Sequence, residues 1–308
     1  MSETMNAGGQ SVGVEVSKTS LTAVCLDASG EIMGEQSAEV DPTQPSSKQI
    51  VGFIAGLSAS FGKFDRVGVA VPGLVGRGGK TVAFSAHIPE HSGLDRAAEI
   101  AAATGLRVVI ENDANAAAYG EFRLGAGRGS RDMFYATLGA GVGGAFILGG
   151  EIWRGAAGFA GEFGYVTINS EGMRIEDVAS SANIIRRTRS RFHQDNTSSL
   201  VELDENEITI ADIVAAAETG DDFAKLMLER TGAYVGTAIA TVINLFNIEK
   251  IVVGGEIMQA KDLILDAIIA RSREFSFGPS FASTEIVGGE LGLNAPAAGA
   301  ALLASEAA

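Results

Sequence analysis

Cysteine, tryptophan and histidine are scarce in this chain. Its 308 residues include one cysteine, Cys25, one tryptophan and three histidines. A single cysteine cannot form an internal disulfide or a thiolate metal cage. His87, His91 and His193 do not stand at a metal-ligand spacing with the cysteine or with a suitable second histidine. A disulfide-built scaffold is therefore excluded, and a zinc hydrolase is disfavoured.

Several sequence signatures are also missing. The chain has no G-x-x-x-x-G-K-[ST], no H-E-x-x-H, no C-x-x-C and no G-x-S-x-G, which argues against a P-loop enzyme and a serine nucleophile. Its longest apolar windows, such as AYVGTAIATVINLF, are shorter than the ~20 residues that span a bilayer. No basic segment followed by an apolar core opens the chain. We expect a cytoplasmic protein without a membrane partner.

Positive charge is in short supply, since the formal net charge is −15. Such a chain repels a phosphate backbone, so we expect no nucleic-acid partner. The one basic stretch, IIRRTRSRF at residues 184–192, carries four arginines spread over several faces of a helix-like segment. This pattern favours a solvated helix face over a binding patch.

What the chain does have is apolar periodicity punctuated by 40 glycines. Alternation predicts three short antiparallel strands at residues 11–17, 21–27 and 30–40, with turns at 18–20 and 29–30. Further elements follow in strand and helix order: a helix over 46–62, a strand over 66–73, a helix over 94–105 and a strand over 107–113.

The second half begins again in the same manner. Residues 133–153 read as two strand-like runs around a glycine-rich turn, and mostly helical sequence follows residue 180. A buried strand is expected at 250–257 and a closing helix at 295–305. Two similar units predict a duplicated α/β fold with a functional cleft between the copies.

The turn GAGVGG, Gly139 to Gly144, has the spacing of a dinucleotide-binding fingerprint. That fingerprint needs a helix after the turn, whereas AFILGG reads as a strand, so a nicotinamide or flavin enzyme is rejected. Backbone amides of such a hairpin could bind phosphate. A tight turn without a ligand remains the alternative, because glycine chiefly supplies positive φ.

Acids next to helix-prone or glycine-rich sequence are the remaining candidates. In VVIENDANAAAYGE, Asp113 stands where a strand gives way to a helix, so it is either an N-cap or a functional acid. Glu162 and Glu176 lie in glycine-rich sequence, where carboxylates suit polyol recognition by charge-assisted hydrogen bonds. Ordinary loop charge is their alternative.

Four segments together resemble the ROK family (repressors, open reading frames and sugar kinases). They are IENDANAAAYGE, TLGAGVGGAFILGGEIWRGAAGFAGEFGY, INLFNIEKIVVGGEI and APAAGAALLA. The resemblance implies a duplicated, ribonuclease H-like α/β fold of the actin, hexokinase and Hsp70 type, with two lobes and a central cleft. Residues 1–125 and a C-terminal helix at 296–308 would form one lobe, and residues 126–295 the other.

The resemblance further implies a hexose kinase of glucokinase type, which phosphorylates the 6-hydroxyl of glucose or a related sugar. Asp113 would be the general base, and Asn112, Glu162 and Glu176 would bind the sugar. Further sugar contacts would come from Gly73, His87 and Tyr165. ATP would meet Ser17, Lys18, Thr19, Gly139, Ala140, Gly141, Gly254 and Gly255. Mg²⁺ would accompany ATP, with Glu15 as a candidate ligand, and the protein would be a homodimer.

The chain also departs from the family's pattern. The first phosphate turn, roughly D-x-G-G-T-K in the family, reads Glu15-Val-Ser-Lys-Thr-Ser20, and Ala140 replaces a usual threonine. Tyr165 stands where the zinc module has histidine, and Arg174 stands at a cysteine position, so no structural zinc is expected. His87 replaces a usual sugar-binding asparagine.

These departures keep a second hypothesis open, which is a non-catalytic, sugar-binding ROK protein. The family's repressors carry an N-terminal winged helix, whereas the strand pattern here begins at about residue 11. A sensor without a DNA-binding domain is therefore the form that this alternative takes.

Overall fold

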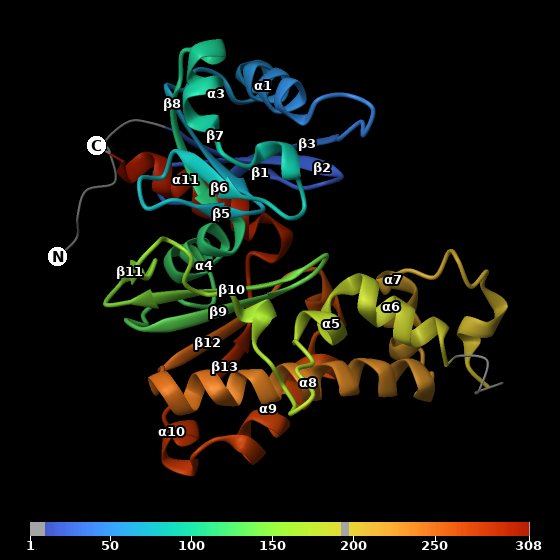
Figure 1. The fold of residues 1–308 in the computed structure, drawn as a ribbon. Coiled ribbons are helices and arrows are strands. Elements are labelled where there is room, and N and C mark those ends of the chain that lie inside the picture. The colour runs from blue at the N-terminus through green and yellow to red at the C-terminus, as the bar shows by residue number, and fades with distance from the viewer. Residues whose placement is uncertain (1–9, 192–196, 308) are drawn as a thin grey trace. The chain divides into compact units, whose positions relative to one another are not determined.

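The computed structural model describes residues 10–191 and 197–307. The chain divides into two compact units. The first unit contains the chain up to Gly129, Phe146–Ala160 and the chain from Leu293 onward, and the second contains Ser130–Ala145 and Gly161–Gly292. Figure 1 shows the elements of each unit in the colours of the sequence.

A five-stranded sheet with the order β3-β2-β1-β4-β8 forms the centre of the first unit. Its strands are β1 (Ser11–Val16), β2 (Ser20–Leu26), β3 (Ile32–Glu39), β4 (Arg66–Val71) and β8 (Arg107–Asn112). The first three are antiparallel, while β4 lies parallel to both β1 and β8. Val14 pairs with Ala23 on one side and Val69 on the other, and all three side chains are buried. The predicted meander is confirmed.

Helices cover this sheet. They are α1 (Ser46–Gly56), α2 (Ser58–Phe61), α3 (Arg96–Thr104), α4 (Asp113–Leu124) and α11 (Ala295–Glu306). The single helix predicted over 46–62 is wrong in detail, because the Leu57 amide bonds to the Ile54 carbonyl and tightens the chain between α1 and α2. Gly105 ends α3 in the left-handed conformation, at φ 74°.

The closing helix α11 packs on β1 and β4 and along α4. The backbones approach so closely that a Cβ atom on Gly68 would lie 1.8 Å from the Ala300 carbonyl oxygen. A Cβ on Gly299 would lie 1.7 Å from the Ala116 carbonyl oxygen. Small residues at these contacts therefore let α11 become part of the first unit's core.

A small antiparallel sheet also belongs to the first unit. It contains β5 (Leu74–Val75), β6 (Thr81–Phe84) and β7 (Leu94–Asp95), with a 3-10 turn, η1 (Pro89–His91), before β7. Alternation did not reveal these strands, because β5 and β7 have only two residues each and the four residues of β6, TVAF, do not alternate.

The second five-stranded sheet has the order β11-β10-β9-β12-β13. Its strands are β9 (Met133–Leu138), β10 (Val142–Leu148), β11 (Glu151–Ile152), β12 (Lys250–Gly254) and β13 (Glu285–Gly288). As in the first sheet, a run of consecutive strands is followed by two parallel ones: Val252 of β12 pairs with both Tyr135 and Val287. The two sheets repeat one topology, which confirms a duplicated α/β fold.

Residues 146–160, which the sequence analysis assigned to the second lobe, cluster with the first unit. The chain thus enters the first unit within β10. A Cβ on Gly158 would lie 2.8 Å from the Val75 carbonyl oxygen, so this segment rests directly on β5.

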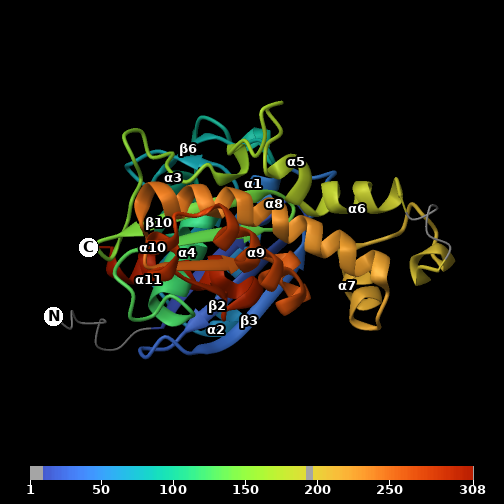
Figure 2. The same cartoon turned by 90° about the horizontal axis from the view of Figure 1, so that it is seen from below.

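Most helices of the second unit follow β11 in sequence. They are α5 (Glu176–Ala179), α6 (Ser181–Arg189), α7 (Ile210–Glu218), α8 (Asp222–Phe246), α9 (Asp262–Phe275) and α10 (Gly278–Ala282). Short 3-10 helices are η2 (Phe163–Tyr165), η4 (Ser199–Glu202), η5 (Glu256–Ala260) and η6 (Gly292–Asn294), of which η6 continues into the first unit. Figure 2 shows α9 running along the 25-residue α8. Among the described residues, no helix combines the length and apolarity needed to cross a membrane.

The basic segment at 184–192 lies partly on α6. Arg187 donates to the Val178 carbonyl at 2.9 Å and to Thr231 Oγ1 at 2.6 Å, and Arg189 donates to the Asn206 carbonyl at 2.6 Å. The prediction of a solvated face is therefore wrong for these two arginines, which tie α6 to its neighbours. Phe192 lies outside the described residues.

Candidate active site

The junction of β8 and α4 holds the acid and amide that the sequence singles out. Asn112, not Asp113, is the N-cap, since its Oδ1 accepts the Asn115 amide at 2.9 Å and Asp113 is the first helical residue. The Asn112 Nδ2 group donates to the Gly73 carbonyl at 3.0 Å and to Asp113 Oδ1 at 2.9 Å. Both amide hydrogens are thus committed, and Asn112 could offer a sugar only the remaining lone pair of Oδ1.

Asp113 is recessed but partly exposed. Its Oδ1 accepts the Ala114 amide at 2.9 Å and Asn112 Nδ2, and Oδ2 can still accept a further hydrogen bond. Burial raises the pKa of Asp113 to about 6, although the Ala114 amide and the charge of His87 act in the opposite direction. A carboxylate with a pKa just below neutrality is suited to accept a proton at neutral pH.

A second carboxylate stands beside Asp113. Burial, followed by the charge of Asp113, raises the pKa of Glu15 near the end of β1 to about 7. Mg²⁺ is commonly bound by one or two carboxylates together with substrate phosphates. Glu15 therefore fits the donor chemistry of a magnesium ion that arrives with a nucleotide, which leaves Asp113 available to accept a proton.

The first phosphate turn, Ser17 to Ser20, is closed by its own side chain. Ser17 Oγ accepts the Thr19 amide at 3.2 Å and the Ser20 amide at 2.9 Å. The Ser17 amide in turn donates to the Ser20 carbonyl at 2.9 Å. A phosphate oxygen would have to displace the Ser17 hydroxyl to reach the Thr19 and Ser20 amides, while the exposed Lys18 side chain remains available to it.

The second phosphate turn is open by comparison. The Gly139 amide donates to the Gly141 carbonyl at 3.0 Å, and the Gly139 carbonyl accepts the Ser181 amide at 2.8 Å. Within the part of the chain that the structure describes, the amides of Ala140 and Gly141 have no acceptor. Successive free amides in a turn form a concavity that favours an anion.

Gly254 is the last residue of β12, and Gly255 follows it next to this turn. A Cβ on Gly255, which has a φ of 93°, would lie 2.4 Å from the Leu138 carbonyl oxygen. Glu256 then accepts a hydrogen bond from Ser181 Oγ at 2.8 Å. The glycines are required by packing against β9, and their contact with a nucleotide stays a prediction.

The two glutamates predicted to bind sugar lie close to one region of the second unit, where α5 meets the start of β10. Glu176 Oε2 accepts the Val142 amide at 3.0 Å, which fastens α5 to the strand that follows the second turn. A Cβ on Gly164 would lie 3.3 Å from the same carboxylate oxygen. Because Gly164 comes two residues after Glu162, the exposed Glu162 belongs to the same small region.

Tyr165 is 60% exposed and stacks against Arg174, whose guanidinium carbon lies 4.4 Å from the ring centroid. Thr167 pairs with Arg174 in a β-bridge, so the stack joins the two ends of a short hairpin. In the described residues, no group of three or more His, Cys, Asp or Glu side chains is arranged for a metal. The stack occupies positions at which the resemblance implies zinc ligands, and the absence of structural zinc stays a prediction.

Comparison with known proteins decides the family. The model of the ROK family matches residues 11–307. This chain belongs to the ROK family.

Two catalogued relatives show the range within that family. The ROK chain is 31% identical to a glucokinase of Streptomyces coelicolor, covering 97% of this chain and 98% of that protein. It is 26% identical to a xylose repressor of Bacillus spizizenii, covering 94% of this chain and 76% of the repressor. Both a kinase and a regulator are therefore similar to this chain over nearly its whole length.

The solved structures agree with the fold. A ROK family glucokinase from Streptomyces griseus, determined with glucose and AMPPNP, is 29% identical and superimposes with a TM-score of 0.88 over 97% of this chain and 100% of that one. The ROK chain therefore has the actin and hexokinase type of α/β fold that the sequence predicted.

The structure groups the predicted site residues of the ROK chain by unit. Glu15, Ser17, Lys18, Thr19, Gly73, His87, Asn112 and Asp113 lie in the first unit, and Gly139, Ala140, Gly141, Glu162, Tyr165, Glu176, Gly254 and Gly255 lie in the second. Sequence reasoning missed the ion pair of the buried Glu111 with the partly exposed Arg154; Glu111 lies directly beside Asn112 and accepts its amide. The available signal was an acid inside the otherwise apolar run that precedes Asn112.

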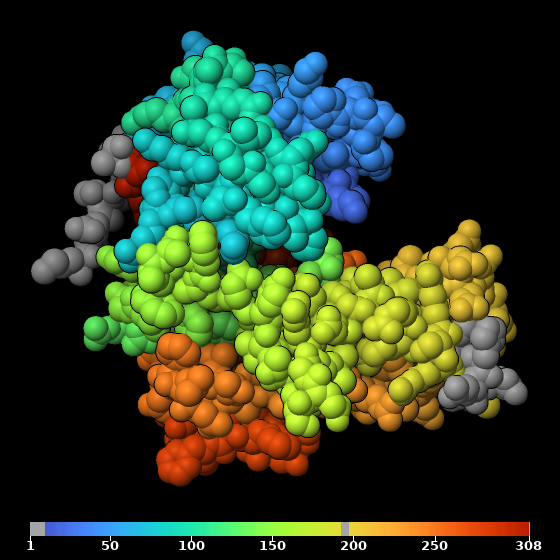
Figure 3. All heavy atoms as spheres, viewed as in Figure 1, coloured from blue at the N-terminus to red at the C-terminus, as the bar shows by residue number. Residues whose placement is uncertain are grey.

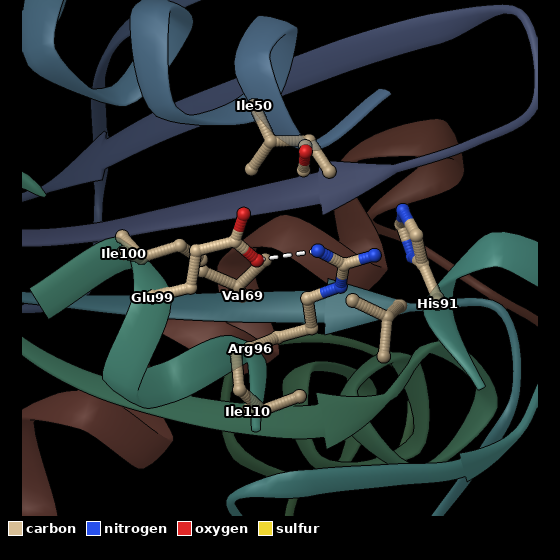
Figure 4. A pocket seen from close by; sticks show the side chains of 9 residues that line it. Ile50, Val69, His91, Arg96, Glu99, Ile100 and Ile110 are labelled. Carbon is tan, nitrogen blue, oxygen red and sulfur yellow. Dashed lines mark hydrogen bonds and ion pairs between the residues drawn. The ribbon is translucent and has the colours of Figure 1, made fainter. Parts of the chain in front are cut away.

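A polar cluster elsewhere in the first unit has a different character. His91 is fully buried, its Nε2 lies 2.6 Å from Ser46 Oγ, and burial together with Arg96 lowers its pKa to about 4. Figure 4 shows His91 and the Arg96–Glu99 pair around a cavity of about 10 Å³. A groove beside it, of about 440 Å³, lies between α1 and α3, whose outer surfaces are visible in Figure 3. His91 is therefore neutral near pH 7 and supports the packing of α1.

Proposed function

We propose that this ROK chain transfers the γ-phosphoryl group of ATP to a hydroxyl of a hexose, with the 6-hydroxyl of glucose or a related sugar as the acceptor. The observation that carries the proposal is Asp113, a carboxylate at the start of α4 whose pKa is raised to about 6. The similarity over almost the whole chain to a Streptomyces coelicolor glucokinase supports it.

In the proposed reaction, Asp113 accepts the proton of the attacking sugar hydroxyl. Phosphoryl transfer asks little covalent work of the protein, so the remaining residues bind and orient. Asn112 would accept one hydroxyl through Oδ1, and Glu162 and Glu176 would accept hydrogen bonds from neighbouring hydroxyls of the ring. Gly73, His87 and Tyr165 would complete the sugar contacts.

The nucleotide would be held mainly by the second turn. The free amides of Ala140 and Gly141 suit phosphate oxygens, and Gly254 and Gly255 would lie near the adenosine. Magnesium, when bound, neutralises charge on the phosphates. Glu15 would hold it, because its carboxylate stands next to Asp113 and is costly to ionise without a cation.

The test is a coupled ADP-release assay with Mg·ATP against glucose, mannose, N-acetylmannosamine, N-acetylglucosamine, fructose and allose. Asp113→Asn should lower kcat by roughly 10²- to 10⁴-fold on the sugar that turns over, as expected for loss of a general base. Its affinity for that sugar should change little. Equal turnover by the variant would contradict the mechanism.

Asp95→Asn provides a matched control. Asp95 caps α3 by accepting the Ala98 amide at 2.9 Å, and asparagine caps a helix about as well as aspartate. This variant removes an acid at a helix start in the same unit without touching Asp113. Its kcat should match that of the unchanged protein.

A second function is favoured by the first phosphate turn. Because Ser17 Oγ occupies the Thr19 and Ser20 amides, phosphate binding there is weakened, which suits a protein that binds sugar without turnover. Similarity to a xylose repressor is consistent with such a role. This alternative would be selected if no panel sugar gave ADP release, while a sugar raised the melting temperature and ATP left it unchanged.

The homodimer stays a prediction from the family resemblance, and the cytoplasmic location stays a prediction from the sequence itself. Light scattering coupled to size-exclusion chromatography would test the first, and cell fractionation would test the second.

A further inference from the structure

Glu111 is a buried charge that the proposed chemistry does not use. Only 5% of the residue is exposed, and it directly precedes Asn112, which is the last residue of β8. Its Oε1 accepts the Asn112 amide at 3.0 Å and Asn115 Nδ2 at 3.0 Å. One carboxylate oxygen therefore holds both Asn112, which precedes Asp113, and Asn115, which lies on the first turn of α4.

The other oxygen of Glu111 accepts a charge-assisted hydrogen bond from Arg154, 43 positions later in the chain. Arg154 follows β11, and its carbonyl accepts the Ala160 amide at 3.3 Å, which closes the loop 154–160. That loop rests on β5 through Gly158. Two residues after Ala160 the chain reaches Glu162.

We propose that Glu111 and Arg154 are a positioning pair for the sugar site, an inference that rests on the proposed function. Glu111 fixes the residues on either side of Asp113, and Arg154 anchors the loop that leads to Glu162. A single ion pair thereby links the start of the base's helix to the segment that delivers a sugar-binding acid. Neither residue needs to touch sugar.

The physical argument is one of arrangement rather than stability. An ion pair with one buried partner adds little net stability, because desolvation of that partner offsets much of the attraction between the charges. Removing Arg154, however, leaves the Glu111 carboxylate buried without its counter-charge, whereas Glu111→Gln takes the counter-charge from Arg154, whose side chain is 33% exposed. The geometry of both segments should then relax, and groups that must be correctly placed lose binding when they are displaced by as little as 1 Å.

The variants are Glu111→Gln, Arg154→Met and the two combined. Each single change should weaken sugar binding about 10-fold, measured as KM and by calorimetry with the panel sugars, while the KM for ATP changes less than about 2-fold. The combined variant should be no worse than the weaker-binding single variant, because both remove the same interaction. Hydrogen exchange should rise at the amides of loop 154–160 in all three.

Arg123→Met is the matched control. Arg123 forms an ion pair with Glu306 near the other end of α4, and its removal should lower the melting temperature without changing sugar affinity. This comparison separates a general loss of stability from misplacement of the site. If the pair were merely structural, its loss would lower the melting temperature and leave sugar affinity unchanged.

The outcomes distinguish the positioning role of the pair from the proposed kinase activity. If the unchanged protein binds sugar without turnover and the pair variants bind it more weakly, the pair stands and the kinase proposal fails. If the unchanged protein turns over a sugar and the pair variants bind that sugar with unchanged affinity, the positioning role of the pair is overturned and the kinase proposal stands. Additive losses in the combined variant also overturn it. A protein that binds no panel sugar overturns both.

Discussion

Asp113, the proposed base, is costly to ionise in the folded protein. Its carboxylate is placed against Ala114, Asn112 and the neighbouring Glu15, in surroundings that favour the neutral form. The folded-state pKa of about 6 lies above the ordinary value of 3.8. The folded protein therefore binds more protons than the unfolded chain between these values, and stability falls as pH rises through that window.

Asp113→Asn should consequently stabilise the protein at pH 8, while the difference should shrink as pH falls toward 4. Denaturation in urea at pH 8 and pH 4.5 would measure it. The activity of the unchanged protein should have the opposite trend and rise through about pH 6 as the base loses its proton. A variant that is less stable at pH 8 would show that the charge of Asp113 is favoured in the fold.

Ser17 offers a second test at the scale of one side chain. Ser17→Gly removes the hydroxyl that occupies the Thr19 and Ser20 amides, so the KM for ATP should fall about 3- to 10-fold, as expected for one or two freed hydrogen bonds. Ser29→Gly, in the other turn of the same meander, is the control and should leave ATP unaffected. An unchanged KM in Ser17→Gly would place the nucleotide's phosphates elsewhere.

At the scale of elements, the contact between α11 and α4 is set by glycine. Gly299→Ala would place a methyl group against the Ala116 carbonyl, so the free energy of unfolding should fall by about 1–3 kcal/mol or more, as overpacking does. Gly52→Ala, in α1, meets no atom within 4 Å and should instead add about 0.5–1 kcal/mol. Thermal denaturation of both variants measures the contrast, and equal effects would contradict this account of the packing.

Periodicity predicted the longer elements of each unit and failed where local chemistry decides. The three strands of the first meander have clear alternation, and the structure contains them. The break at Leu57 depends on one hydrogen bond, and the exchange of cap from Asp113 to Asn112 depends on which oxygen reaches the Asn115 amide. Neither choice leaves a mark in the pattern of apolar residues.

At the scale of the whole molecule, the repeated sheet order could be predicted because both halves open with a strand, a turn and a strand. The family resemblance supplied the candidate site residues and their roles, since composition and spacing leave Glu162 and Glu176 as ordinary loop acids. Glu111 and Arg154 escaped prediction because they meet only through the tertiary fold, 43 positions apart.

The place of α11 in the sequence has a consequence for synthesis. The helix that fills the face of β1 and β4 begins at Ala295, after all residues of the second unit. During translation the face of the first sheet that carries Gly13 and Gly68 therefore lacks its covering helix while more than half of the chain is still being made. The long contiguous stretch of the second unit can fold on the ribosome before then, so the unit whose synthesis begins first is the one that we expect to finish folding last.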